Sequence, residues 1–204
     1  MEFPNVFLHN VPRWSTRALL VVGVALSVSC NRQPEWRGTP VTPATTLAST
    51  NFSDSTGATV PLVPSAGQAA LVFFGYTNCP DVCPTTLADW VRVKQAMGAD
   101  AGRVRFVFIS VDPARDTPAV AQQFAAKFDP SFLGLAAPAE QIANVQAAFG
   151  ANAVVSDTHA GTDHVTAHSA QTFLVDDRGT ILVAYRFGAG WDVMSADLKT
   201  LLKQ

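Results

Sequence analysis

The sequence predicts an α/β fold in which a central mixed β-sheet is flanked by helices on both faces. Two continuous apolar runs, residues 69–76 and 104–111, have the aromatic and β-branched content of buried central strands. A helical pattern follows each run, and two further strand-like runs near the C-terminus flank a turn-rich linker. This order of elements fits such a sheet, although order alone is compatible with several folds.

The helices are recognised by spacing and by start and stop signals. The first is predicted over 85–97, where Leu87, Trp90 and Met97 recur at helical spacing before Gly98. The second begins at Thr117-Pro118, because threonine can cap a helix and proline suits its first position; it runs to about Phe128. A third, over 138–149, is amphipathic, and one of its faces contains Ile142, Val145 and Phe149.

The C-terminal part is predicted to be a hairpin and a closing helix. Residues 171–175 and 181–187 read as strands, and Asp176-Asp177-Arg178-Gly179 between them has the composition of a turn. The last helix is expected over 191–202. A polar stretch at 157–166 forms an insert before the hairpin.

Composition limits the classes of function. Of the 204 residues, 48% are apolar and 15% are charged, which is typical of a folded domain rather than a disordered chain. Fourteen basic and sixteen acidic residues give a formal charge of −2. A nucleic-acid-binding protein would carry a basic excess, so we expect no nucleic-acid partner.

The N-terminal residues read as an export signal. Twelve uncharged residues, 18–29, follow Arg13 and Arg17 and end at Cys30. As a helix they would span about 18 Å, well short of the roughly 30 Å of bilayer hydrocarbon. Cys30 lies where a lipoprotein signal is cut and the new N-terminal cysteine acylated. Simple cleavage and an uncleaved anchor are the alternatives, and all three place the domain outside the reducing cytosol.

This reading divides the chain into three parts. Residues 1–29 are expected to be a lipoprotein-type signal peptide. Residues 30–53 comprise the lipidated cysteine and a flexible tether, because the segment is rich in Pro, Thr, Ser and Ala without periodicity. Residues 54–204 are then the folded domain.

Cys79 and Cys83 are the strongest candidates for chemistry. They form a C-x-x-x-C motif between a buried strand and a helix, where a helix start near Cys83 would favour its thiolate. A purely structural disulfide is disfavoured, because closing three residues removes little loop entropy. The pair suits redox chemistry or a soft metal ion, and imidazole from His159, His164 or His168 could complete a metal site.

Three segments in order resemble the Sco/SenC family of copper proteins, which assemble cytochrome c oxidase. They are FFGYTNCPDVCPTTL at 73–87, SVDPARDTP at 110–118, and His168-Ser169 followed by TFLVD at 172–176. The resemblance covers roughly 45–204. It implies a thioredoxin-like fold that binds one copper ion, as Cu(I) or also as Cu(II), through Cys79, Cys83 and His168. When oxidised, the two cysteines would form a disulfide.

The resemblance also implies a function. The protein would be a membrane-tethered, periplasm-facing chaperone that receives copper from a donor protein and delivers it to the dinuclear copper site of cytochrome c oxidase subunit II. A thiol–disulfide reductase using Cys79 and Cys83 as its catalytic pair is the enzymatic alternative, and a copper or redox sensor is another. Ordinary thioredoxins carry a proline before the strand that begins near 171, whereas 169–172 contain none. A metallochaperone is therefore favoured over an enzyme.

Other polar residues near these motifs have simpler expected roles. His159 and His164 are not needed by a three-ligand site and are expected to be solvated loop residues. Asp112, Arg115 and Asp116 are expected to order the loop beside the site by ion pairing and capping.

Overall fold

The computed structural model describes residues 34–151, 153–156, 164–167 and 170–203. Residues 1–29, which are predicted to be a signal peptide, and Cys30, His159 and His168 lie outside these residues, so the expectations about them remain predictions. Within the described part, no helix is long and apolar enough to cross a membrane.

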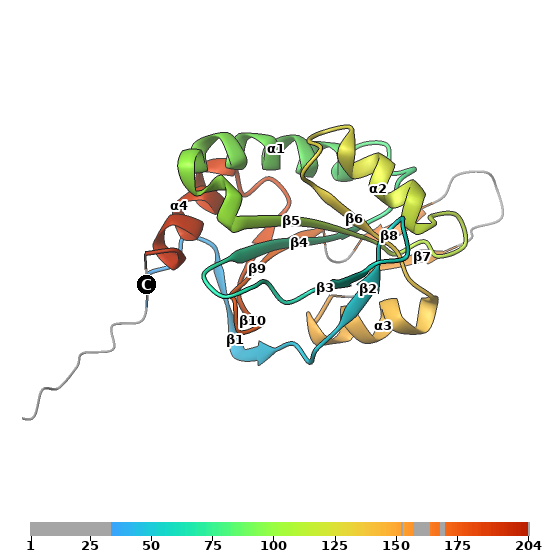
Figure 1. Cartoon of the computed structure of the whole chain (residues 1–204), viewed down its shortest axis with the longest axis horizontal. Coiled ribbons are helices and arrows are strands. Elements are labelled where there is room, and N and C mark those ends of the chain that lie inside the picture. Colours follow the sequence, from blue (N-terminus) through green and yellow to red (C-terminus); the bar gives the residue numbers. More distant parts are fainter. Residues whose placement is uncertain (1–33, 152, 157–163, 168–169, 204) are drawn as a thin grey trace, which may run out of the picture. The chain divides into compact units, whose positions relative to one another are not determined.

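One mixed sheet forms the centre of the fold (Figure 1). Its strand order is β1-β10-β9-β4-β5-β6. Strands β4, β5 and β6 are mutually parallel, and β9, β10 and β1 join as antiparallel neighbours. The bounds are β1 Thr39–Thr46, β4 Ala69–Gly75, β5 Val104–Ser110, β6 Leu133–Leu135, β9 Gln171–Val175 and β10 Thr180–Arg186. The α/β class and the mixed sheet predicted from the sequence are confirmed.

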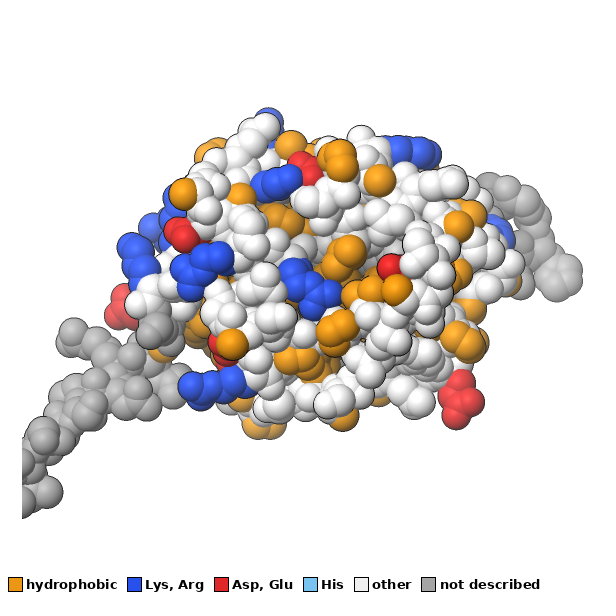
Figure 2. All heavy atoms as spheres, in the orientation of Figure 1, with side chains coloured by type: hydrophobic (Ala, Val, Ile, Leu, Met, Phe, Trp, Pro, Cys, Tyr) orange, Lys and Arg blue, Asp and Glu red, His pale blue; other side chains and the backbone are white. Residues whose placement is uncertain are grey.

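Helices cover both faces of this sheet (Figure 1). Helices α1 (Val82–Met97), α2 (Pro118–Ala126) and α4 (Trp191–Leu201) bury apolar residues in one core cluster, whereas α3 (Ala139–Ala148) packs into a second cluster. Smaller elements complete the described chain: η1 Gly98–Arg103, the pair β2 Asn51–Ser53 and β3 Thr59–Pro61, and the pair β7 Ala153–Ser156 and β8 His164–Ala167. On the face shown in Figure 2, charged side chains are spread singly across largely uncharged surface.

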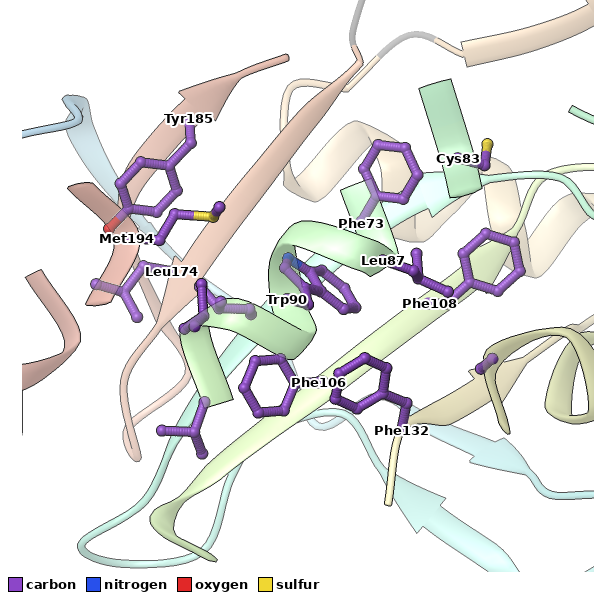
Figure 3. Close-up of a cluster of buried hydrophobic side chains, with 14 of the residues drawn as sticks. Phe73, Cys83, Leu87, Trp90, Phe106, Phe108, Phe132, Leu174, Tyr185 and Met194 are labelled. Carbon is purple, nitrogen blue, oxygen red and sulfur yellow. The ribbon is translucent and has the colours of Figure 1, made fainter. Parts of the chain in front are cut away.

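Trp90 fixes helix α1 on the sheet. Its ring is fully buried and lies 6.4 Å from the Phe73 ring, 5.7 Å from Phe106 and 5.9 Å from Phe132, measured between centroids. Figure 3 shows these rings around Trp90 on α1, with Cys83 at the edge of the same cluster. Because aromatic rings bury large apolar areas, this contact fixes where the first turn of α1 begins relative to β4.

The tether predicted for residues 30–53 is wrong for residues 34–53, which belong to the folded unit. Strand β1 pairs with β10 and strand β2 pairs with β3, and the compact unit that contains the sheet begins at Pro34 rather than at 54. Pro40 and Pro43 argued against a strand in the sequence, because proline has no backbone N–H to donate. Strand β1 lies at the edge of the sheet, where a missing N–H is tolerated.

A buried carboxylate holds the start of this unit in place. Asp197 in α4 is fully buried and accepts hydrogen bonds from the backbone N–H groups of Arg37 (2.8 Å) and Gly38 (3.0 Å). It also accepts one from the Tyr185 hydroxyl, at 3.0 Å. Three donors satisfy a charge that burial alone would disfavour. The segment before β1 is thereby bound to the C-terminal helix.

Replacing this carboxylate should therefore destabilise the fold. Asp197→Ala leaves three donors without their acceptor, one of them the buried Tyr185 hydroxyl, and we expect the free energy of unfolding to fall by about 3 kcal/mol. Asp177→Ala is the control, because Asp177 is only half-buried and accepts a hydrogen bond from the Gly67 N–H. Urea denaturation of both variants measures the difference. Equal stability of the two variants would contradict the role given to Asp197.

Candidate metal centre

The two cysteines lie at the edge of the sheet where β4 and β5 end together. Gly75, the last residue of β4, pairs with Ser110, the last residue of β5. The chain then forms a short loop that contains Cys79 and enters α1, whose first turn contains Cys83. The helix begins three residues earlier than predicted, because the Asp81 carbonyl accepts the Thr85 N–H at 3.0 Å.

Cys83 is packed into the protein, and its neighbour on the strand makes this possible. The side chain is 2% exposed. A Cβ placed on Gly75 would lie 2.7 Å from the Cys83 sulfur and 2.8 Å from the Phe73 ring. Because real Cβ atoms do not approach other atoms so closely, only glycine at position 75 leaves room for this sulfur. Figure 3 shows Cys83 on α1 beside Phe73 and Phe108.

Cys79 is half-buried and faces the start of the helix. Its sulfur accepts a hydrogen bond from the backbone N–H of Cys83, at 3.4 Å. This N–H is one of those that a helix start leaves without an intrahelical partner. Both cysteines are free thiols. The helix start thus supplies a donor to Cys79, whereas the sequence suggested that it would act on Cys83.

The two thiols consequently differ in acidity. The Cys83 thiol hydrogen-bonds to the Cys79 sulfur, and together with the backbone donors of Cys83 and Asp81 it lowers the pKa of Cys79 to about 5, against the opposing effect of burial. The same bond, added to burial, raises the pKa of Cys83. At neutral pH the pair therefore holds one thiolate, Cys79, and one protonated thiol, Cys83. Burial and the adjacent Cys79 charge also raise the pKa of Tyr76, to about 12.

Asp116 ties the cysteine loop to the segment after β5. Its buried carboxylate accepts hydrogen bonds from the Thr77 N–H (2.9 Å), the Thr77 hydroxyl (2.6 Å) and the Ser110 hydroxyl (2.5 Å). Thr77 is two residues before Cys79. The carboxylate therefore fixes the backbone that leads into the candidate site, as expected from the sequence.

Asp112, Arg115 and Thr117 order the same segment. The Arg115 guanidinium forms an ion pair with buried Asp112, and the Asp112 carbonyl accepts the Asp116 N–H at 2.9 Å. The Thr117 hydroxyl caps α2 by accepting the Val120 N–H at 3.3 Å. Pairing and capping are confirmed for these residues. Gly75, Thr77 and Ser110 were not singled out from the sequence, although a glycine at the end of a buried strand is a signal for close packing.

The third predicted ligand lies outside the described residues, because His168 falls in the gap between 167 and 170. The side chains of His159 and His164 are not described either. The chain enters β9 at the same edge of the sheet: Thr172 is opposite Phe73, two residues before Gly75. Among the side chains that the structure does describe, no group of three His, Cys, Asp or Glu could hold a metal ion.

The donors present suit a soft ion. Two sulfur atoms in adjacent positions, one of them already a thiolate, are ligands for Cu(I) or Zn(II) rather than for a hard cation. A bound ion would replace the proton that Cys83 holds, since metal binding deprotonates thiols. The half-buried position of Cys79 leaves that sulfur accessible to an incoming ion.

The difference in acidity gives a direct test. We expect iodoacetamide to label Cys79, with a rate that levels off above about pH 6 because its pKa is near 5. Cys83 should remain unlabelled over the same range. In Cys83→Ala the neighbouring donor is gone, so the midpoint for Cys79 should move to higher pH. Peptide mapping by mass spectrometry measures both sites; a Cys79 rate that still climbs above pH 8 would contradict the assignment.

The space at Gly75 gives a second test. Gly75→Ala should push the Cys83 sulfur out of its position, destabilise the domain by about 1–3 kcal/mol through overpacking, and expose Cys83 to alkylation. Gly102→Ala is the matched control, because a Cβ on Gly102 meets nothing within 4 Å. Chemical denaturation and thiol labelling measure the two effects. The packing argument fails if both variants behave as wild type.

Comparison with known proteins identifies the family to which this chain is similar. The model of the SCO1/SenC family matches residues 41–203. A SCO2-like protein of Rickettsia felis is 34% identical over 117 residues, which are 57% of this chain and 57% of that protein. This chain thus spans a little over half the length of that curated relative.

Two solved structures show the same fold. The apo Sco1 protein from Thermus thermophilus is 33% identical and superposes with a TM-score of 0.71, over 83% of this chain and 99% of that one. Bradyrhizobium japonicum ScoI, solved with copper bound, is 36% identical with a TM-score of 0.65, over 76% and 99%. The thioredoxin-like fold expected from the sequence is therefore confirmed. With its fold, its cysteine pair and its family match in agreement, this chain belongs to the SCO1/SenC family.

Proposed function

We propose that this protein is a copper chaperone that takes part in the assembly of cytochrome c oxidase. The observation that carries the proposal is the Cys79–Cys83 pair, two free thiols held next to each other at the strand–helix junction, one as a thiolate. Family membership and the copper-bound Bradyrhizobium relative support copper as the ion. The resemblance of the three sequence segments supports oxidase assembly as the process.

In this proposal Cys79, Cys83 and His168 hold one Cu(I) ion. Two thiolates and a neutral imidazole form a soft donor set for Cu(I). Binding releases the Cys83 proton, so copper affinity should rise with pH wherever this thiol must lose its proton. Cys79 binds first, because it is already ionised at neutral pH.

Delivery would proceed by exchange of thiolate ligands. The proposed client is subunit II of cytochrome c oxidase, whose dinuclear copper site would receive the ion. A client thiolate would replace half-buried Cys79 first, since Cys83 is 2% exposed and reachable only after the site opens. The copper keeps at least two ligands throughout, and no electron is transferred.

The same proposal locates the protein in the bacterial cell envelope. Cleavage before Cys30 and acylation of that cysteine would anchor the chain to the membrane, with the domain facing the periplasm. Two or more acyl chains give firm anchoring. The intact mass of the mature protein tests this part, and an unmodified N-terminus would refute it.

A second candidate function is a thiol–disulfide reductase. It is favoured by the unequal acidity of the pair, because an attacking thiolate next to a protonated thiol is the arrangement that disulfide exchange needs. Cys79 would attack a client disulfide and form a mixed disulfide; Cys83 would then release the client dithiol and leave a Cys79–Cys83 disulfide. His168 has no part in this reaction.

His168 therefore separates the two functions. We expect Cys79→Ser and Cys83→Ser to abolish tight Cu(I) binding, because a hydroxyl is a poor soft ligand, and His168→Ala to weaken binding without unfolding the domain. His159→Ala and His164→Ala are the matched controls and should bind copper as wild type does. Competition with a Cu(I) chelator measures all five variants.

The same variant decides between chaperone and reductase in the cell. His168→Ala should fail to restore oxidase activity to a strain that lacks this protein, while its dithiol still exchanges with a disulfide-containing client peptide. Restored activity at limiting copper would favour the reductase. Loss of affinity in His159→Ala or His164→Ala, equal to that in His168→Ala, would mean that the third ligand is misassigned.

A further inference from the structure

We propose that the edge of the sheet around Cys79 and Cys83 is the docking face for the copper-receiving protein, with Phe187, Trp191 and Val120 as its apolar contacts. The inference rests on the proposed function and adds the surface that recognises the client. These three residues are called the apolar rim below.

The rim residues are exposed and do not pack in the hydrophobic core. Among the described residues, three large hydrophobic side chains are exposed: Phe187 (46%), Trp191 (38%) and Val120 (38%). None of them belongs to either core cluster or packs at its margin, within the part of the chain that the structure describes. Single exposed apolar residues are ordinary, but their gathering at one end of a protein indicates an interaction site.

Strand register places Phe187 beside the cysteines. Tyr185 in β10 is opposite Thr172 in β9, which is opposite Phe73 in β4. Two residues further on, the Phe187 N–H donates to the Ala170 carbonyl at 2.9 Å, level with Gly75. The backbone of Phe187 is thus two strand spacings, about 10 Å, from Gly75, the residue that leaves room for the Cys83 sulfur.

Helix α1 and the turn before α4 share a small hollow at this edge. Thr86, about one helical turn after Cys83, lines it together with Phe187, Ala170 and Met194. Trp191 is the first residue of α4, directly after the turn. Phe187 and Trp191 therefore lie on the α4 side of the cysteine pair.

Val120 lies on the opposite side of the pair. The backbone of its neighbour Ala121 packs on Gly134 in β6, where an added Cβ would lie 2.0 Å from the Ala121 carbonyl oxygen. Gly134 is opposite Phe108 in β5, which is opposite Phe73. Gly134 is thus two strand spacings from β4, on the side away from β9 and β10, and Val120 lies in the helix that packs there. The rim residues therefore lie on both sides of β4.

The segments that carry the rim residues and Cys79 are uncharged, and charged residues border them: Asp81, Arg186 and Asp192 adjoin these segments, and Asp89 and Arg186 line the hollow. Residues 73–80, 117–121 and 187–191 contain no Lys, Arg, Asp or Glu. The core of a protein–protein interface is poor in charge and rich in aromatic side chains, and these segments have both features. An apolar centre with charged residues at its border fits a folded protein whose receiving thiols are surrounded by apolar surface with a polar periphery.

The turn that carries two of the rim residues is already ordered. Gly188 and Gly190 have φ angles of 80° and 88°, which favour glycine, and the Ala189 N–H donates to the Arg186 carbonyl at 3.0 Å. A surface that is fixed before binding loses little conformational entropy when the partner docks. Copper exchange needs such contact, because Cys83 is buried and a client thiol can reach the ion only if the two surfaces meet.

Copper transfer to two acceptors tests the docking face. The full-length protein is loaded with Cu(I) and mixed with the reduced copper domain of the organism's own oxidase subunit II, or with a small Cu(I) chelator. Phe187→Ser/Trp191→Ser should lower the second-order rate of transfer to the protein client at least about ten-fold, as expected for loss of two apolar anchors. Val120→Ser should lower it in the same direction, and transfer to the chelator should be unchanged.

Two further variants complete the design. Trp191→Phe keeps most of the apolar area and should retain most of the rate. Leu202→Ser is the control for loss of an apolar side chain away from the rim, because Leu202 follows the C-terminal end of α4, is partly exposed and packs at the margin of the first core cluster. Thermal denaturation of each variant establishes that it is folded.

The outcomes separate this inference from the proposed function. If wild-type protein transfers copper to subunit II and the double variant does so equally fast, the docking face is overturned and the chaperone function stands. If the double variant also transfers slowly to the chelator, the residues act on the metal site itself, and docking is again overturned. If wild-type protein transfers no copper to subunit II, the proposed function fails, and this inference fails with it.

Discussion

The candidate metal centre depends on the packing of the Cys83 sulfur against the end of strand β4. A glycine at position 75 leaves the space for that sulfur, and the buried Trp90 ring holds the helix that carries it. With Cys83 fixed there, its backbone N–H and its thiol both reach the Cys79 sulfur. The lowered pKa of Cys79 and the retained proton on Cys83 both follow from this arrangement, because the Cys83 thiol donates its proton in a hydrogen bond to the Cys79 thiolate.

The segment at 110–118 holds the loop that contains Cys79 in place. Asp116 is 37 residues after Cys79 in the chain, yet its carboxylate accepts three hydrogen bonds that hold Thr77 and Ser110 together. Because all three partners donate to it, the carboxylate organises the cysteine loop without needing to touch an ion. The segment's aspartates and arginine are explained by this scaffolding, so no ligand role has to be assigned to them.

The sequence predicted the elements with strong local signals and missed those fixed by tertiary contacts. Strands β4 and β5 were found within one residue, since both are continuous apolar runs, and the cap at Thr117 was correct. Strand β1 was missed because Pro40, Pro43 and several threonines resemble a linker, whereas pairing with β10 and the buried Asp197 determine its structure. Strand β6 has three residues and no periodicity to detect. Cys79 and Cys83 were identified, but which sulfur is ionised depends on packing, and His168 as a ligand stays a prediction.

The central claim is that one copper ion is bound by both cysteines and one histidine. X-ray absorption spectroscopy at the copper edge of the Cu(I)-loaded, full-length protein measures this most directly, because sulfur and nitrogen scatterers are distinguishable in the first coordination shell. The account predicts two sulfur ligands and one imidazole nitrogen in wild-type protein, and loss of the imidazole alone in His168→Ala. A single sulfur ligand, or an unchanged imidazole contribution in that variant, would contradict it.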